Sequence, residues 1–181
     1  MPKGRIITIA AFCTAAAFAA FQIAVPVYGG IHLTLTPLIG ILTGPAIGSL
    51  VVLIINVLSA AIGHGGFGMI GANTLVNIVE VITAYVIYKG VKRVIRGGFV
   101  PAGIATFVAL FAGNIAMVAI ILISGILGST QSHEQILYCL YVLATINMVV
   151  AFIEAIVTGF MIGFLEQVRP DLLRERKGSA R

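Results

Sequence analysis

The side chains best suited to chemistry in this sequence are its three histidines, His32, His64 and His133. Each lies in a glycine-rich or polar stretch beside an apolar run. Imidazole is the commonest protein ligand for transition metals near neutral pH, so a metal site is one interpretation of these residues. The other is that they lie at the edge of the apolar runs and bind nothing. The residues alone leave both interpretations open.

A second candidate set consists of polar side chains inside the apolar runs. An unpaired polar group in an apolar surrounding is costly, so each of them needs a partner. Asn73, Asn77 and Glu80 are spaced by four and three residues and therefore share one face of a helix. For Glu80 and Glu154 three roles stay open: a proton relay, a substrate ligand, or a contact between helices. The full set is Asn56, Asn73, Asn77, Glu80, Asn114, Asn147 and Glu154.

Motifs typical of enzymes do not occur in the chain. It has no G-x-x-x-x-G-K-[ST] phosphate loop, no H-E-x-x-H zinc motif and no G-x-S-x-G nucleophile turn. We therefore expect a protein that is not an enzyme and has no catalytic residues. If it moves a solute against a gradient, it needs ion coupling or a separate ATPase.

The composition indicates the surroundings in which these side chains are held. The chain is 60% hydrophobic and 9% charged, with a mean hydropathy of +1.12. A soluble domain carries about 25% charged residues, so this chain has too few to cover a surface facing water. Its apolar runs are continuous rather than alternating, which disfavours a β-barrel. The composition predicts an all-α integral membrane protein, with residues 1–181 forming a single membrane domain.

Six apolar runs predict a bundle of six transmembrane helices. The second run is short for a hydrocarbon core of about 30 Å. Gly44 and Pro45 separate it from the third run, because a residue before proline disfavours the helical region and glycine interrupts helices. The predicted helices cover about 6–25, 33–43, 46–62, 72–88, 100–126 and 136–164, with a cytoplasmic tail over 165–181.

The basic residues support this count of six. The net charge is +5, and we interpret it as a topology signal rather than as a nucleic-acid surface. With six spans and both termini cytoplasmic, all eleven Lys and Arg residues lie on the inner side. A single span over 33–62 would place the cluster at 89–96 outside. The same topology places all three histidines on the outer side.

The first apolar run carries alanines at a spacing of four. Small residues at this spacing let a second helix approach closely inside a bilayer. The alternative is that alanine is simply common in membrane helices. The two stripes are Ala11, Ala15 and Ala19, and Ala16, Ala20 and Ala24.

Several short motifs occur in a characteristic order. They are Gly29-Gly30-Ile31-His32-Leu33, Ile41-Leu42-Thr43-Gly44-Pro45, Gly65-Gly66, Gly71-Ala72-Asn73 and Asn77, followed near the end by Glu154-Ala155, Phe164-Leu165 and 168–173, VRPDLL. Together they resemble the substrate-binding membrane component of energy-coupling factor (ECF) transporters. More narrowly, they resemble its cobalt/nickel branch, the CbiM/NikM type. The resemblance covers about 25–173.

The resemblance implies a subunit that captures its substrate from outside in a six-helix core. Such a subunit docks on a transmembrane coupling subunit with two ATPase subunits, in the cell membrane. It implies cobalt or nickel ions as the transported substrate and no resident cofactor. His32 is similar to a metal-ligand histidine of that family. The implied metal ligands are His32 and His64, with Asn73 and Asn77 lining or supporting the site, and the alanine stripes of the first helix are the implied coupling face.

One departure from the family pattern bears on the metal site. The cobalt/nickel branch begins Met-His-Ile-x-[Asp/Glu]-Gly, and its amino terminus and second-position histidine help to chelate the ion in a nitrogen-rich site. This sequence begins Met1-Pro2-Lys3, and proline supplies neither an imidazole nor a backbone N–H. We expect that His64 and His133 substitute, that the substrate differs, or that a separate small subunit supplies ligands.

Two other functions remain open at this stage. The first alternative is the same architecture with an organic micronutrient, such as a vitamin, as its substrate. In that case Tyr28, Phe67 and Tyr138 would line an apolar pocket. The absence of tryptophan disfavours this alternative. The second alternative is a membrane assembly protein that transports nothing and whose alanine stripes only anchor partners.

Overall fold

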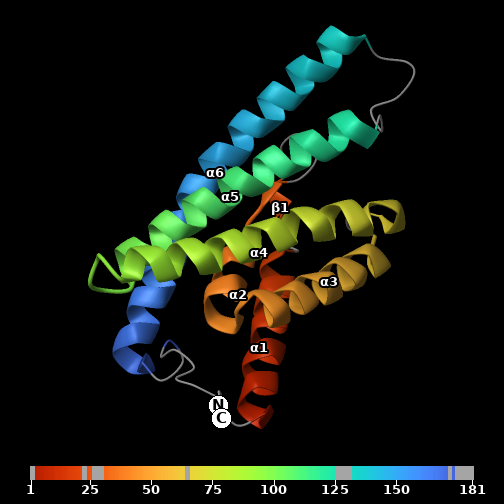
Figure 1. Ribbon diagram of the computed structural model, residues 1–181. Coiled ribbons are helices and arrows are strands. Elements are labelled where there is room, and N and C mark those ends of the chain that lie inside the picture. The colour runs from red at the N-terminus through yellow and green to blue at the C-terminus, as the bar shows by residue number, and fades with distance from the viewer. Residues whose placement is uncertain are drawn as a thin grey trace.

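The computed structural model describes residues 3–21, 24–25, 31–63, 66–124, 132–170 and 173, and these form an almost entirely helical chain (Figure 1). The helical architecture confirms the all-α part of the predicted fold class. Within the described residues the helices are α1 (Lys3–Phe21), α2 (Thr36–Thr43), α3 (Pro45–Ala61), α4 (Ile70–Lys92), α5 (Phe99–Ser124) and α6 (His133–Val168), with a 3-10 turn, η1 (Phe67–Met69), and two short strands, β1 (Ala24–Val25) and β2 (Ile31–His32).

Three segments of the described chain are long and apolar enough to cross a membrane. They are Phe67–Lys92, Phe99–Ser124 and Glu134–Val168. Shorter apolar helices run over Ala10–Ala19 and Pro45–Ala61. The count of six spans and the cytoplasmic placement of both termini therefore stay predictions.

The prediction that the first helix extends to Val25 is wrong. Helix α1 ends at Phe21, and Ala24–Val25 forms strand β1, which pairs antiparallel with β2. Ala24 lies opposite His32, and Val25 lies opposite Ile31. Val25 precedes Pro26, and the ring of a proline pushes the preceding residue out of the helical region and toward an extended one. This pairing places the backbone of His32 beside that of Ala24.

The second helix begins later than predicted, at Thr36 rather than at residue 33. Leu33 and Thr34 are not helical, and Leu35 has a left-handed backbone with a φ of 52°. Helix α2 has eight residues and is therefore about 12 Å long, less than half of a bilayer core. The predicted break between the second and third helices is confirmed, since Gly44, with a φ of 79°, separates α2 from α3.

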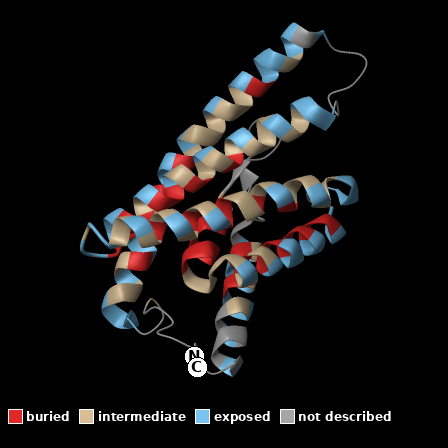
Figure 2. Ribbon diagram, viewed as in Figure 1, coloured by how far each residue is buried: buried red, intermediate tan, exposed pale blue. Residues whose placement is uncertain are grey.

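Helix α4 is the element against which α2 and α3 pack, and the contact centres on Val81. A methyl group on Gly40 would meet the backbone oxygen of Val81 and lie 3.0 Å from its Cα. A methyl group on Gly48 would lie 2.7 Å from Cγ1 of Val81. Both glycines are thus required for the close approach of α2 and α3 to α4. Figure 2 shows α2 almost wholly buried at this contact.

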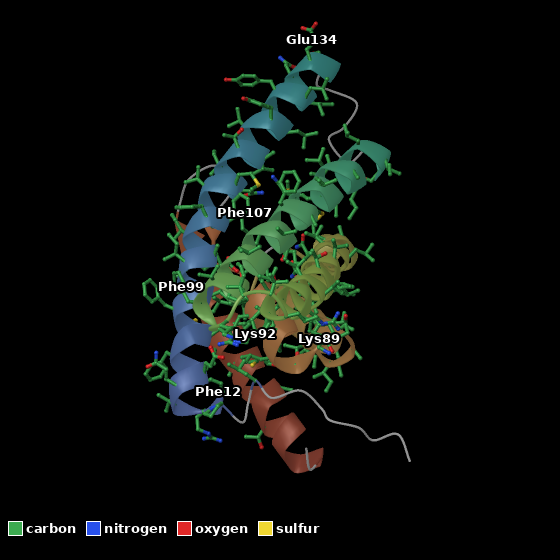
Figure 3. The ribbon with its side chains drawn as sticks, turned by 60° about the vertical axis from the view of Figure 1, so that its left-hand side comes forward. Phe12, Lys89, Lys92, Phe99, Phe107 and Glu134 are labelled. Atoms are coloured by element: carbon green, nitrogen blue, oxygen red, sulfur yellow. The ribbon has the colours of Figure 1, made fainter. Side chains whose placement is uncertain are left out.

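Helices α5 and α6 form a long hairpin that extends beyond the other helices at one end (Figure 1). Helix α6 begins at a capping box in which the Ser132 hydroxyl accepts a bond from the backbone N–H of Gln135. It continues to Val168, past the predicted end at residue 164, and its 36 residues span about 54 Å. Figure 3 shows Glu134 at one tip of the hairpin, while Lys92 lies toward the opposite end.

Candidate functional site

Two buried carboxyl groups in the helical core mark the candidate site. Glu154 on α6 is 1% exposed and Glu80 on α4 is 6% exposed. Both bind the segment 33–36, which joins strand β2 to helix α2 and directly follows His32. The partners described for them are neutral backbone amides and hydroxyls.

Glu154 holds the first part of this segment. Its Oε2 accepts a bond from the backbone N–H of Thr34 at 3.0 Å, and its Oε1 accepts one from the N–H of Leu35 at 2.9 Å. The Thr34 hydroxyl donates to Oε1 at 3.1 Å. A carboxylate that accepts several such bonds is well satisfied even when it is buried. The segment gains backbone partners that neither a helix nor a sheet provides at these positions.

Glu80 holds the end of the segment. Its Oε2 accepts a hydrogen bond from the Thr36 hydroxyl, and the hydroxyl oxygens of Thr36 and Thr34 lie 3.0 Å apart. Gly113 on α5 makes room for this carboxyl, since a methyl group there would lie 2.5 Å from Cγ of Glu80 and 2.8 Å from its Cδ. Glu80 and Glu154 therefore accept hydrogen bonds from two neighbouring hydroxyls of one short segment.

The sequence left the role of these two acids open, and the structure places both of them in contacts between segments far apart in the chain. The partners that sequence reasoning missed are Thr34 and Thr36. Their spacing of two within the apolar run at 33–43 was the available signal. Two hydroxyls at that spacing point to one side of an extended or irregular segment, where they can meet polar groups of other helices.

The three histidines are placed only in part. The backbone of His32 lies in β2, two residues before Thr34, and its side chain lies outside the description. His64 lies outside the described residues. His133 is the first residue of α6, and its side chain is likewise not described. Among the described side chains no group of three or more His, Cys, Asp or Glu residues gathers, so the assignment of His32 and His64 as metal ligands stays a prediction.

Asn73 and Asn77 lie on α4, between its first residue, Ile70, and Glu80. Asn77 is 7% exposed and Asn73 is half-buried. The predicted shared face of Asn77 and Glu80 is confirmed by the burial of both. Asn77 lies one helical turn from Glu80, toward the connection between α3 and α4 that carries His64. Their predicted role at a substrate site stays a prediction.

Helix α1 presents part of its small residues away from the rest of the described chain. Cys13 and Ala17 are buried, and Phe12 on the other side is 74% exposed. The predicted coupling face is exposed at Ala11, Ala15, Ala16 and Ala19, while the side chain of Ala20 is not described. These four alanines are therefore uncovered within the described chain, and the docking role of the stripes stays a prediction.

A chain with long apolar helices and polar side chains paired in its interior has the features of a multi-pass membrane protein. Residues 2–172 match the profile of the family CbiM, described as the cobalt uptake substrate-specific transmembrane region. The chain belongs to this family, which confirms the resemblance found in its motifs and the membrane location.

Similar proteins agree with this assignment. A protein of Methanocorpusculum labreanum, whose name describes a cobalt transport protein CbiM 1, is 28% identical over 180 residues, which is 94% of this chain and 76% of that protein. Two crystal structures, one of a transition metal transporter and one of a truncated transition metal transporter, share the fold. The TM-scores are 0.77 and 0.78 at 19% identity, over 90% and 91% of this chain and 76% and 82% of those chains.

Proposed function

We propose that this protein is the substrate-capture membrane subunit of an energy-coupling factor importer for cobalt or nickel ions. The observation that carries the proposal is the match to a cobalt uptake family over residues 2–172. The name of the relative and the descriptions of the two similar structures point to the same substrate class. The subunit binds the ion from the outer side and passes it to a coupling subunit.

His32 and His64 are the proposed ligands, with Asn73 and Asn77 supporting the site. Imidazole nitrogen suits both nickel and cobalt among the divalent first-row metals. His32 directly precedes the segment bound by Glu154 and Glu80, so its backbone is attached to an ordered part of the core. Asn77 lies on the helix that carries Glu80. A ligand on an ordered backbone loses less entropy when it binds an ion.

The proposed partners are a transmembrane coupling subunit and two ATPase subunits. The chain contains no phosphate-binding loop, so ATP hydrolysis takes place on a partner. The exposed alanines of α1 are the proposed docking face, because small residues permit close helix packing in a bilayer. Co-purification of a coupling protein and two ATPases with this subunit supports the assignment. Isolation of the subunit without them from its own membranes, under conditions that preserve ECF complexes, contradicts it.

The ion site is tested by calorimetric titration of the purified full chain in detergent with cobalt(II) and nickel(II). We expect binding of one ion, and a rise of the dissociation constant by at least about tenfold in His32→Ala. His133→Ala is the matched comparison, since an equal rise of the constant there would add His133 to the ligands. Failure of the unmodified chain to bind either ion argues against the proposed substrate. Unchanged affinity in His32→Ala argues against the ligand assignment.

A further inference from the structure

We propose that Glu154 and Glu80 are positioning residues that form a clamp, the Glu154–Glu80 clamp, which holds the segment 33–36 against the core and sets the position of His32. The inference rests on the proposed function, since it assigns the clamp the task of orienting an ion ligand. It goes beyond that function because it names a step, the docking of this segment, on which ion binding depends.

The clamp binds backbone N–H groups that have no partner within a helix or a strand. The N–H groups of Thr34 and Leu35 belong to neither a helix nor a strand, and both donate to Glu154, 120 and 119 residues further along the chain. Leu35 has a left-handed conformation, which residues with a side chain rarely adopt and which persists only where the surroundings impose it. Without the carboxylate, this conformation loses the bond that holds it.

The clamp also joins two helices. Glu154 lies on α6 and Glu80 on α4, and both accept hydrogen bonds from hydroxyls of the same segment, those of Thr34 and Thr36. Glu154, Glu80 and Thr36 are buried and Thr34 is half-buried. Few water molecules can therefore compete for these hydrogen bonds. The segment is therefore docked only when α4 and α6 both present their carboxyl groups to it.

His32 follows the state of the clamp because the chain between them is short. One residue, Leu33, separates His32 from Thr34, so the two Cα atoms lie at most about 7 Å apart. The backbone of His32 is thus held near Thr34 when the segment is docked and gains freedom when the segment detaches. Ion binding and docking then favour the same conformation, and each strengthens the other by the same factor.

The test measures hydrogen exchange of the amides in segment 33–36 in the purified full chain, without metal and with cobalt(II). Glu154→Gln keeps the size of the side chain but retains one oxygen, so it accepts at most part of the bonds made by Thr34 and Leu35. Glu166→Gln is the matched control, since it removes a carboxylate of the same helix that pairs with Lys92 instead.

We expect exchange at residues 34 and 35 to be at least about tenfold faster in Glu154→Gln, with α4 and α5 unchanged. Cobalt(II) partly restores protection, and its dissociation constant rises about tenfold, as follows if nine tenths of the molecules have released the segment. Glu166→Gln leaves both quantities unchanged. Protection at residues 34 and 35 that is equal in Glu154→Gln and the unmodified chain overturns the clamp.

The two proposals fail in different ways. If the unmodified chain binds neither cobalt(II) nor nickel(II), the proposed function fails, and exchange without metal still decides whether the clamp exists. If Glu154→Gln exchanges rapidly but binds cobalt(II) with unchanged affinity, the inference that the clamp positions an ion ligand is overturned. Should Glu154→Gln fail to fold, Thr34→Val and Thr36→Val decide the matter by the same readouts, because each removes one hydroxyl and leaves both carboxyl groups.

Discussion

Two glutamates on helix α6, Glu154 and Glu166, differ in their burial and in the kind of partner they bind. Glu154 is buried and is bound by the neutral N–H and hydroxyl groups of a distant segment. Glu166 has a side chain that is 36% exposed and pairs with the Nζ of Lys92 at 2.5 Å, and Lys92 also donates to the carbonyl of Gly97 at 2.9 Å. Solvent screens the ion pair of Glu166 with Lys92, whereas the buried carboxyl of Glu154 depends wholly on its protein donors. Burial, rather than formal charge, decides which of the two constrains the fold.

The largest effect in this comparison is expected for Glu154→Ala. It leaves the N–H groups of Thr34 and Leu35 without their acceptor in a buried place and opens space in the core. We expect the free energy of unfolding in detergent to fall by about 3 kcal/mol. Denaturant or thermal unfolding followed by circular dichroism measures it. A loss no larger than that of Glu166→Ala would remove the distinction between the two sites.

Gly113→Ala is expected to have the next largest effect, since it pushes on the other carboxyl of the clamp. The added methyl group overlaps Glu80, and overpacking of a filled site costs about 1–3 kcal/mol. Gly103→Ala on the same helix is the control, because its methyl group would lie 3.4 Å from the backbone oxygen of Ala155, an ordinary contact. Equal unfolding midpoints for the two variants would show that Glu80 is free to move.

A smaller loss is expected in the α5–α6 hairpin. Asn114 donates to the carbonyl of Ala144 at 3.0 Å, while Asn147 makes longer contacts, 3.5 Å to Asn114 and 3.7 Å to Met117. We expect Asn114→Ala to cost about 1 kcal/mol, in the range of hydrogen bonds between membrane helices, and Asn147→Ala to cost less. Unfolding of the two variants side by side measures the difference, and the reverse order would contradict it.

The smallest effect is expected for Glu166→Gln, which keeps the shape of the side chain and removes its charge. A partly exposed ion pair contributes about 0–1 kcal/mol. The loss is expected to disappear as salt is added, because ions in solution screen the pair. Unfolding at low and high ionic strength measures this dependence. A loss of several kcal/mol that persists in high salt would place Glu166 in the same class as Glu154.

The sequence allowed the helices to be predicted far better than the segment between β2 and α2. Continuous apolar runs, together with the pair Gly44-Pro45, indicated α2 to α6 because helical periodicity and helix interruption are local properties. The face shared by Asn77 and Glu80 followed from spacing in the same way. Residues 33–35 were predicted as helix because their composition is apolar. Their conformation is instead set by Glu154, 119–120 residues away, and no local pattern reports a partner at that distance.

The contact of Gly40 with Val81 has a mechanical consequence for the residues before α2. Since not even a methyl group fits between these two backbones, α2 cannot slide along α4 without separating from it. Rotation about the bonds of Leu33 to Leu35 then moves His32, together with the paired strands β1 and β2, while α2 stays in place. The short helix acts as a fixed base, and the four-residue arm in front of it reaches at most about 14 Å. A motion of that size involves only the residues before α2 and leaves the packing of α2 against α4 unchanged.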